Sequence, residues 1–132
     1  MTIVNANSIK AKEVLADMIS KVGSTQTDEA INMWLTFGLG TEMFNAWITF
    51  DEDEPIGMIT AEVVDADGPA VYIAFNWFKS GQAGNENLIT KVGEWARELE
   101  IKKILYYTKK SPNTFIKKYG FSLVQSVLQK DV

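Results

Sequence analysis

The chain has 132 residues, the usual size of one domain, and its 46% apolar and 23% charged residues exclude a disordered tail or a collagen-like chain. It has neither cysteine nor histidine, which excludes disulfides, thiolate chemistry, zinc sites of the usual kind and serine or cysteine triads. No apolar run approaches the ~18–20 residues of a membrane span, and the N-terminus lacks a signal-peptide pattern. We therefore expect a soluble, cytoplasmic protein that makes no use of a membrane, with residues 1–132 forming a single domain.

The formal net charge of −4 is unevenly distributed. Residues 1–78 carry a net charge of −9, and residues 79–132 carry +5. An acidic chain is not expected to bind nucleic acid, which usually requires a basic domain. The asymmetry favours docking of an anionic ligand on the C-terminal part, and the alternative is that these charges only solvate helix faces.

The first part of the chain predicts a short strand and two helices. The strand covers residues 2–4, and apolar residues from Ile9 to Val22 then follow helical spacing. Thr27 caps a second helix, which the glycines after Phe37 end. The pattern then changes to three strands joined by turns, at residues 44–50, 56–64 and 71–78.

The second part of the chain alternates helices with strands. Apolar residues from Leu88 to Leu99 recur at helical steps, with charged residues on the other face. A buried strand follows at residues 104–107, then a short helix at 111–118 and a last strand at 121–128.

This order of elements, with Tyr119-Gly120-Phe121 near its end, resembles the GCN5-related N-acetyltransferase (GNAT) family. The hairpin at residues 55–57, the strand–loop–helix at 71–99 and the segment at 115–121 look like the family at matching places. The resemblance covers about residues 44–132 well and the N-terminal helices by order. It implies an α+β fold, an α/β/α sandwich whose mixed, mostly antiparallel central sheet is flanked by helices. Residues 113–116 are similar to short acetyltransferase-like proteins encoded by tailed phages.

The resemblance also implies acetyl-CoA as the cofactor, with its pyrophosphate held by the loop before the third helix. Backbone N–H groups and the helix dipole attract such an anion. The family's Q/R-x-x-G-x-G/A pattern falls on Ser80, Ala83 and Asn85 or, two residues later, on Gln82, Asn85 and Asn87, and neither register matches it. Glu86 adds a carboxylate in the first helical turn, which repels the anion.

We assign cofactor binding to the end of the third long strand and the loop that follows it. The residues are Trp77, Phe78, Gly81, Gln82, Ala83, Gly84 and Asn85. A backbone N–H at residues 76–78 would polarise the thioester carbonyl. The alternative interpretation is an ordinary strand-to-helix turn capped by Asn85.

The catalytic candidates are a carboxylate and a strand tyrosine, and no metal is expected. The family's acid tyrosine is replaced here by Ile116, which has no proton to give. Without histidine, the base must be a carboxylate, and Glu62 lies on the second long strand, either buried with a raised pKa or facing solvent. Tyr107, or its neighbour Tyr106, is the candidate acid for the leaving thiolate, and the alternative role of both is packing.

The sequence leads to two candidate functions of different classes, an enzyme and a binding protein. The first is an acetyl-CoA-dependent N-acetyltransferase that acetylates a primary amine of a small molecule or a protein. The second is a catalytically degenerate GNAT-fold protein that binds or assembles with a phage or host protein partner, because both the loop pattern and the acid position are altered. A homodimer is left open.

Overall fold

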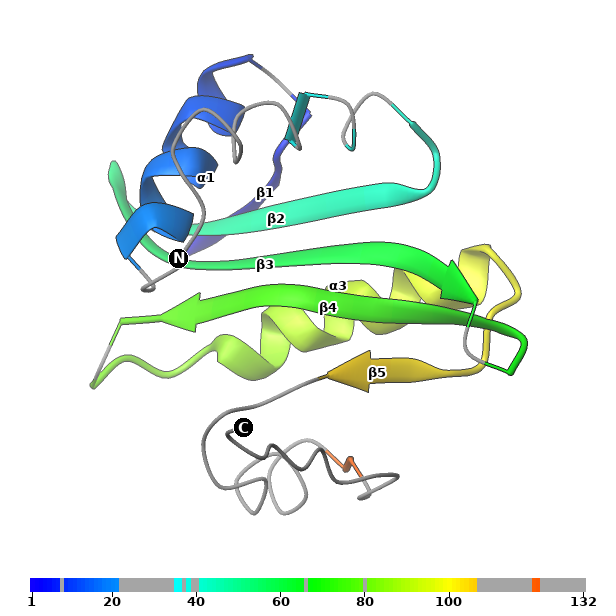
Figure 1. Ribbon diagram of the computed structural model, residues 1–132. Helices are drawn as coiled ribbons and strands as arrows, with labels where there is room; N and C mark the ends of the chain where they lie inside the picture. Colours follow the sequence, from blue (N-terminus) through cyan, green and yellow to red (C-terminus); the bar gives the residue numbers. More distant parts are fainter. Residues whose placement is uncertain are drawn as a thin grey trace, which may run out of the picture.

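The computed structural model of the protein describes residues 1–7, 9–21, 35–36, 38, 41–65, 67–79, 81–106 and 120–121. These residues form five strands and two helices (Figure 1). The elements are β1 (Thr2–Asn5), α1 (Ile9–Lys21), β2 (Phe44–Asp51), β3 (Glu54–Asp65), β4 (Pro69–Phe78), α3 (Asn85–Glu98) and β5 (Ile104–Tyr106). The second and fourth predicted helices and the last predicted strand lie outside the described residues, apart from a few positions.

Each predicted element that falls on described residues is present, and the first four strands, β1 to β4, are longer than expected. The predicted strands at 44–50 and 56–64 leave residues 51–55 to the turn between them, but β2 runs through Asp51 and β3 begins at Glu54. Only Glu52 and Asp53 remain in the turn, and all four carboxylates are exposed. A two-residue connection is the common hairpin geometry, and it lets the charged side chains stay in water while the backbone pairs.

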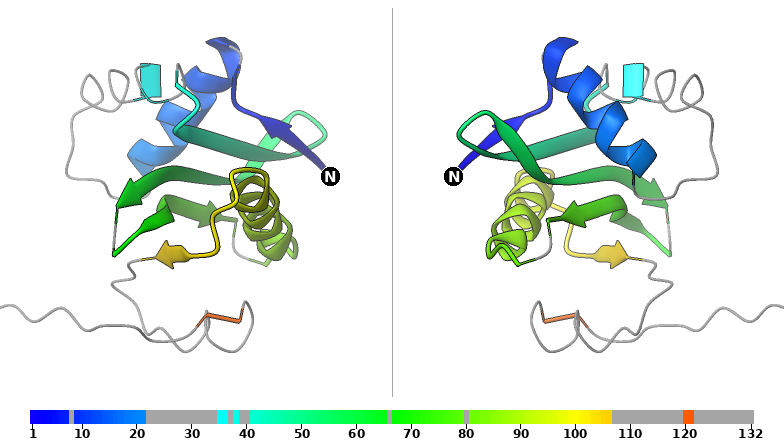
Figure 2. Two further views of the ribbon diagram at one scale, coloured as in Figure 1. Left: turned by 90° about the vertical axis from the view of Figure 1, so that its right-hand side faces the viewer. Right: turned by 90° about the vertical axis from the view of Figure 1, so that its left-hand side faces the viewer.

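The strands form one sheet in the order β1-β2-β3-β4-β5, antiparallel except for the parallel pair β4–β5. The predicted fold class, with a mixed and mostly antiparallel sheet, is therefore confirmed. The two helices cover opposite faces (Figure 2). Leu15 and Ile19 of α1 pack on one face, and Leu88 and Val92 of α3 pack on the other. No described helix is long and apolar enough to cross a membrane.

A β-bulge interrupts β4 in its middle. Thr60 of β3 pairs with Phe75, while Ala61 pairs with Ile73, so that Ala74 has no partner on β3. Because the bulge adds one residue, Phe75 packs on the α1 face although Ile73 lies on the α3 face. Among the described residues, Val71 to Ile73 of β4 pair with Ile104 to Tyr106 of β5.

Candidate active site

The start of α3 is built from backbone that only glycine adopts easily. Gly81 has φ +82° and Gly84 has φ +133°, both in the left-handed range. Gly84 is the N-cap residue of α3 and Asn85 is its first helical residue, so the predicted cap at Asn85 is wrong by one position. No side chain of the described residues caps this helix end, and Gly81, Gln82 and Ala83 are exposed. Among the described residues, this corner therefore exposes loop backbone, and no side-chain hydrogen bond caps the helix start.

Phe78 fills the space between the helix start and the sheet. A Cβ atom added at Gly57 would lie 2.3 Å from Cδ2 of the Phe78 ring, and one added at Gly84 would lie 3.3 Å from its Cζ. Gly57 also pairs with Phe78 across β3 and β4. Because the two glycines lack Cβ atoms, they leave room for the Phe78 ring, and the ring positions the N-cap of α3 against β3. Phe78 belongs to the predicted site, but its side chain acts as a packing wedge there.

Two asparagines join β4 to the first residue of α3. Nδ2 of Asn76 donates hydrogen bonds to Oδ1 of Asn85, at 2.8 Å, and to the carbonyl oxygen of Met58, at 3.1 Å. Nδ2 of Asn85 donates in return to Oδ1 of Asn76, at 3.1 Å. We call this arrangement the amide clamp. Its signal in the sequence is weak, because one amide stands on a strand and the other in a loop-like run of polar residues.

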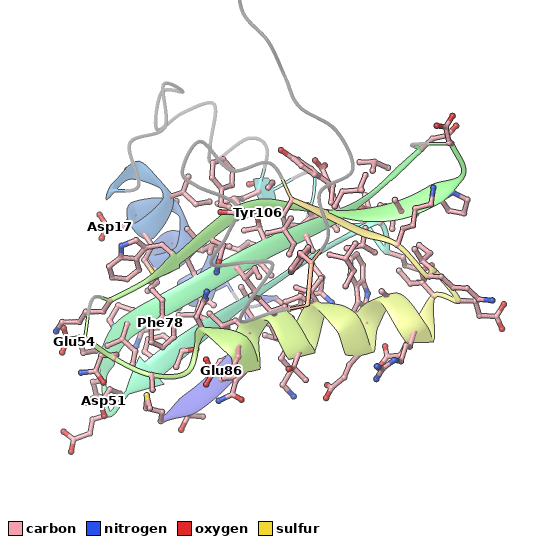
Figure 3. All side chains as sticks on the ribbon, turned by 90° about the horizontal axis from the view of Figure 1, so that it is seen from below. Asp17, Asp51, Glu54, Phe78, Glu86 and Tyr106 are labelled. Atoms are coloured by element: carbon pink, nitrogen blue, oxygen red, sulfur yellow. The ribbon has the colours of Figure 1, made fainter. Side chains whose placement is uncertain are left out.

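The side chains around this corner are mostly acidic. Glu86 stands in the first turn of α3, and Figure 3 shows it at the same end of the sheet as Phe78, Glu54 and Asp51. The ammonium of Lys79 lies 2.8 Å from Oε1 of Glu54. The hydrogen bond to Glu54, and then the charges of Glu54 and Asp51, raise the pKa of Lys79. Lys79, which lies at this corner in the described part of the chain, is therefore already paired with a carboxylate.

Glu62 lies next to the bulge, on the α1 face of β3. It pairs with Tyr72 across the two strands, in the second pair after the register shift between Thr60 and Ala61. The side chain is half-buried, and burial raises the pKa of its carboxyl. The structure places Glu62 between the two environments predicted for it, because its side chain is only half-buried.

Thr60 and Tyr72 stand beside Glu62 and were missed by the sequence reasoning. The hydroxyl of Thr60, which is fully buried, accepts a hydrogen bond of 3.1 Å from the N–H of Phe75. Tyr72 stands directly opposite Glu62. Their positions beside Glu62 depend on the pairing of β3 with β4, and no sequence motif indicates that pairing.

The remaining predicted residues are divided between the two faces. Trp77 packs on the α1 face, away from the α3 face to which Phe78 belongs. Tyr106 is half-buried on the α3 face, and burial, followed by the charge of Tyr72, raises the pKa of its hydroxyl. Tyr107 lies outside the described residues. Roughly 16 Å of β3 separate Glu62 from Gly57. The base candidate lies on the α1 face, whereas the glycine loop leads into α3 on the other face.

A hollow of about 470 Å³ lies at the other end of α3. It is lined by Asn7, Thr41, Glu42, Phe44, Asn45, Trp95 and Leu99. None of the predicted site residues lines it. The site candidates therefore stand apart from this hollow.

Solved structures of N-acetyltransferases share this fold. The aminoglycoside 6′-N-acetyltransferase of Acinetobacter haemolyticus is 12% identical, with a TM-score of 0.83 over 100% of this chain and 98% of that one. A predicted acetyltransferase of Clostridium acetobutylicum, solved with acetyl-CoA, is 18% identical, with a TM-score of 0.75 over 98% of this chain and 95% of that one. Glucosamine-6-phosphate N-acetyltransferase of Arabidopsis thaliana is 12% identical, with a TM-score of 0.76 over 99% of both chains.

These likenesses confirm the fold expected from the resemblance, that of the GNAT acetyltransferases. No protein-family model and no curated protein sequence matches the chain. At 12–18% identity the likeness concerns the path of the backbone, and the chemistry has to be argued from the residues.

Proposed function

We propose that this chain, which has the GNAT fold, transfers an acetyl group from acetyl-CoA to a primary amine of a small molecule or a protein. The observation that carries the proposal is the start of α3 at Gly84, which has no side-chain cap among the described residues and follows the bulged strand β4 along the chain. A neighbour of the same fold was solved with acetyl-CoA, and others are named as transferring acetyl groups to aminoglycosides or to glucosamine 6-phosphate.

The backbone around Gly81 and Gly84 fits a phosphate-bearing cofactor. A Cβ added at Gly81 would meet nothing within 4 Å, so that this loop leaves open space beside the helix start. Residues 81–85 would hold the phosphates with backbone N–H groups and the positive end of the α3 dipole. Residues 76–78 would meet the rest of the cofactor with the backbone of β4. Acetyl-CoA supplies the acetyl group as an activated thioester, and the chain supplies binding and a base.

Glu62 is the proposed base for the acceptor amine. The amine must lose one proton as its nitrogen forms the amide bond, and a half-buried carboxylate with a raised pKa is a better acceptor of that proton than an exposed one. The proton for the released thiolate would come from Tyr107 or from solvent. Tyr72, which pairs with Glu62 across β3 and β4, would orient the carboxylate.

Titration with acetyl-CoA tests the proposal directly. At a ligand concentration about a thousand times the dissociation constant, binding should raise the free energy of unfolding by about 4 kcal/mol. Calorimetry gives the dissociation constant, and a thermal-shift assay gives the stabilisation. Coenzyme A without the acetyl group serves as the comparison, because it contains the same phosphates.

A second candidate function is favoured by the acidic corner. Glu86 stands in the first turn of α3 and Glu54 neutralises Lys79, which is a poor setting for a pyrophosphate. If neither acetyl-CoA nor coenzyme A shifts the melting temperature at millimolar concentration, the transferase proposal is wrong. The chain is then best described as a GNAT-fold binding or assembly protein, with a phage or host protein as the partner to seek.

The Glu62→Gln variant is expected to lower turnover by about a hundredfold or more, because it removes the proton acceptor. Acetyl-CoA affinity should stay unchanged. The wild-type rate should rise with pH through the raised pKa of Glu62, since only the carboxylate accepts a proton, and the variant should lack this rise.

Stability gives an independent check on Glu62. A carboxyl whose pKa is raised by folding favours the native state while it is protonated, and this contribution is lost as pH rises through that pKa. The Gln variant should therefore be at least as stable as the wild type at neutral pH.

The control for the rate measurement is Glu13→Gln. Glu13 is an exposed carboxylate on α1, and its replacement should leave the rate unaltered. An undiminished rate in Glu62→Gln would exclude Glu62 as the base.

A further inference from the structure

The amide clamp connects the two parts of the molecule on which the proposed function rests. Asn76 lies two residues after Ala74, the bulge residue of β4, and Asn85 directly follows Gly84, the N-cap of α3. Between the two asparagines the chain runs through residues 77–84, with an exposed loop that holds two glycines in left-handed conformations. Such a loop does not by itself define where a helix starts relative to a strand.

The hydrogen bonds of the amide clamp fix the start of α3 relative to β4. Both side chains are half-buried, and each amide uses its N–H and its carbonyl on the other, at 2.8 Å and 3.1 Å. The additional bond of 3.1 Å from Asn76 to the carbonyl of Met58 ties the pair to β3 as well. A reciprocal amide pair accepts one relative orientation of its two backbones, because both hydrogen bonds must be near-linear together.

We infer that Asn76 and Asn85 are positioning residues of the proposed cofactor site, which set the spacing between the bulge in β4 and the phosphate-binding start of α3. The inference rests on the proposed function. Acetyl-CoA carries its phosphates at one end and its thioester at the other, so it must meet both places at once. Two half-sites held at the right spacing bind one linked ligand far more tightly than they bind its separate halves. The clamp supplies that spacing through side chains.

The test compares the whole cofactor with its parts. We measure by calorimetry the affinities of wild type, Asn85→Ala and Asn76→Ala for acetyl-CoA, for adenosine diphosphate and for S-acetylpantetheine. Asn85→Ala is the milder change, because Asn76 keeps its bond to Met58. We expect the affinity for acetyl-CoA to fall about tenfold while each fragment loses less than about threefold. Thermal melts confirm that the variants are folded, and if Asn76→Ala fails to fold, Asn85→Ala decides.

The chain offers a matched control in a second amide pair, where Nδ2 of Asn5 donates to Oδ1 of Asn45 at 2.7 Å between β1 and β2. Asn5→Ala should lower stability and leave the ratio of whole-cofactor to fragment affinity as in the wild type. A ratio that stays unchanged in Asn85→Ala, or that falls equally in Asn5→Ala, overturns the positioning role while the transferase proposal stands. Absence of acetyl-CoA binding by the wild type overturns both.

Discussion

Gly57→Ala is expected to be among the most destabilising single-methyl additions in the described part of the chain. The new Cβ would lie 2.3 Å from Cδ2 and 2.6 Å from Cε2 of the Phe78 ring, far inside van der Waals contact. The ring cannot simply move toward α3, because Gly84 stands on that side. Overpacking of this kind costs about 1–3 kcal/mol. Chemical denaturation measures the loss as a lower midpoint with an unchanged slope.

Gly93→Ala is the matched control for this prediction. Gly93 lies inside α3, and a Cβ there would meet nothing within 4 Å. Alanine is the better helix former, so this variant should gain about 0.5–1 kcal/mol of stability. The same chemical change should thus act in opposite directions at the two sites. Equal stability of Gly57→Ala and the wild type would show that Phe78 is not wedged between β3 and α3.

Gly84→Ala is expected to impair both stability and acetyl-CoA binding. At φ +133° a residue with a Cβ is strained by about 1–3 kcal/mol, and the Cβ would also lie 3.3 Å from Cζ of Phe78. Relieving the backbone strain or the contact with Phe78 would shift the N-cap of α3, whose backbone is the proposed phosphate site. We expect acetyl-CoA affinity, measured by calorimetry, to fall about tenfold, which corresponds to about 1.4 kcal/mol.

Gly68→Ala separates strain from binding. Gly68 has φ +107° in the β3–β4 turn, where a Cβ would meet nothing within 4 Å. This variant should suffer a similar backbone strain without any change in acetyl-CoA affinity. If Gly84→Ala and Gly68→Ala bind the cofactor equally well, the loop before α3 is not the phosphate site.

Most of the strands and helices could be predicted because their signals are local. The alternation in residues 44–50 and the helical spacing from Leu88 to Leu99 each reflect one element burying one face. The strand ends were less accurate, since the charged residues at 51–54 suggest a turn, while the backbones of Asp51 and Glu54 still pair. Charge reports the solvent exposure of a side chain, and it says little about the hydrogen bonds of the backbone beneath it.

The candidate site was predicted only in part. The glycine loop and Glu62 were found, since glycines before a helix and a carboxylate within an apolar strand are visible in one dimension. The wedge of Phe78 and the amide clamp were not, because each depends on which residues face one another across strands and loop. The bulge at Ala74 is a further example, as nothing in residues 71–78 marks the point at which the faces exchange.

Taken by itself, the amino-acid sequence determined which segments are strands and helices, and that the turn between β2 and β3 is acidic. It also excluded cysteine and histidine chemistry. These properties belong to single residues or to a local periodicity. Tertiary structure decided that Asn76 meets Asn85, that Phe78 lies between two glycines and that Glu62 becomes half-buried beside a bulge. These are relations between distant residues, and they exist only once the sheet register and the packing of α3 bring the backbones together.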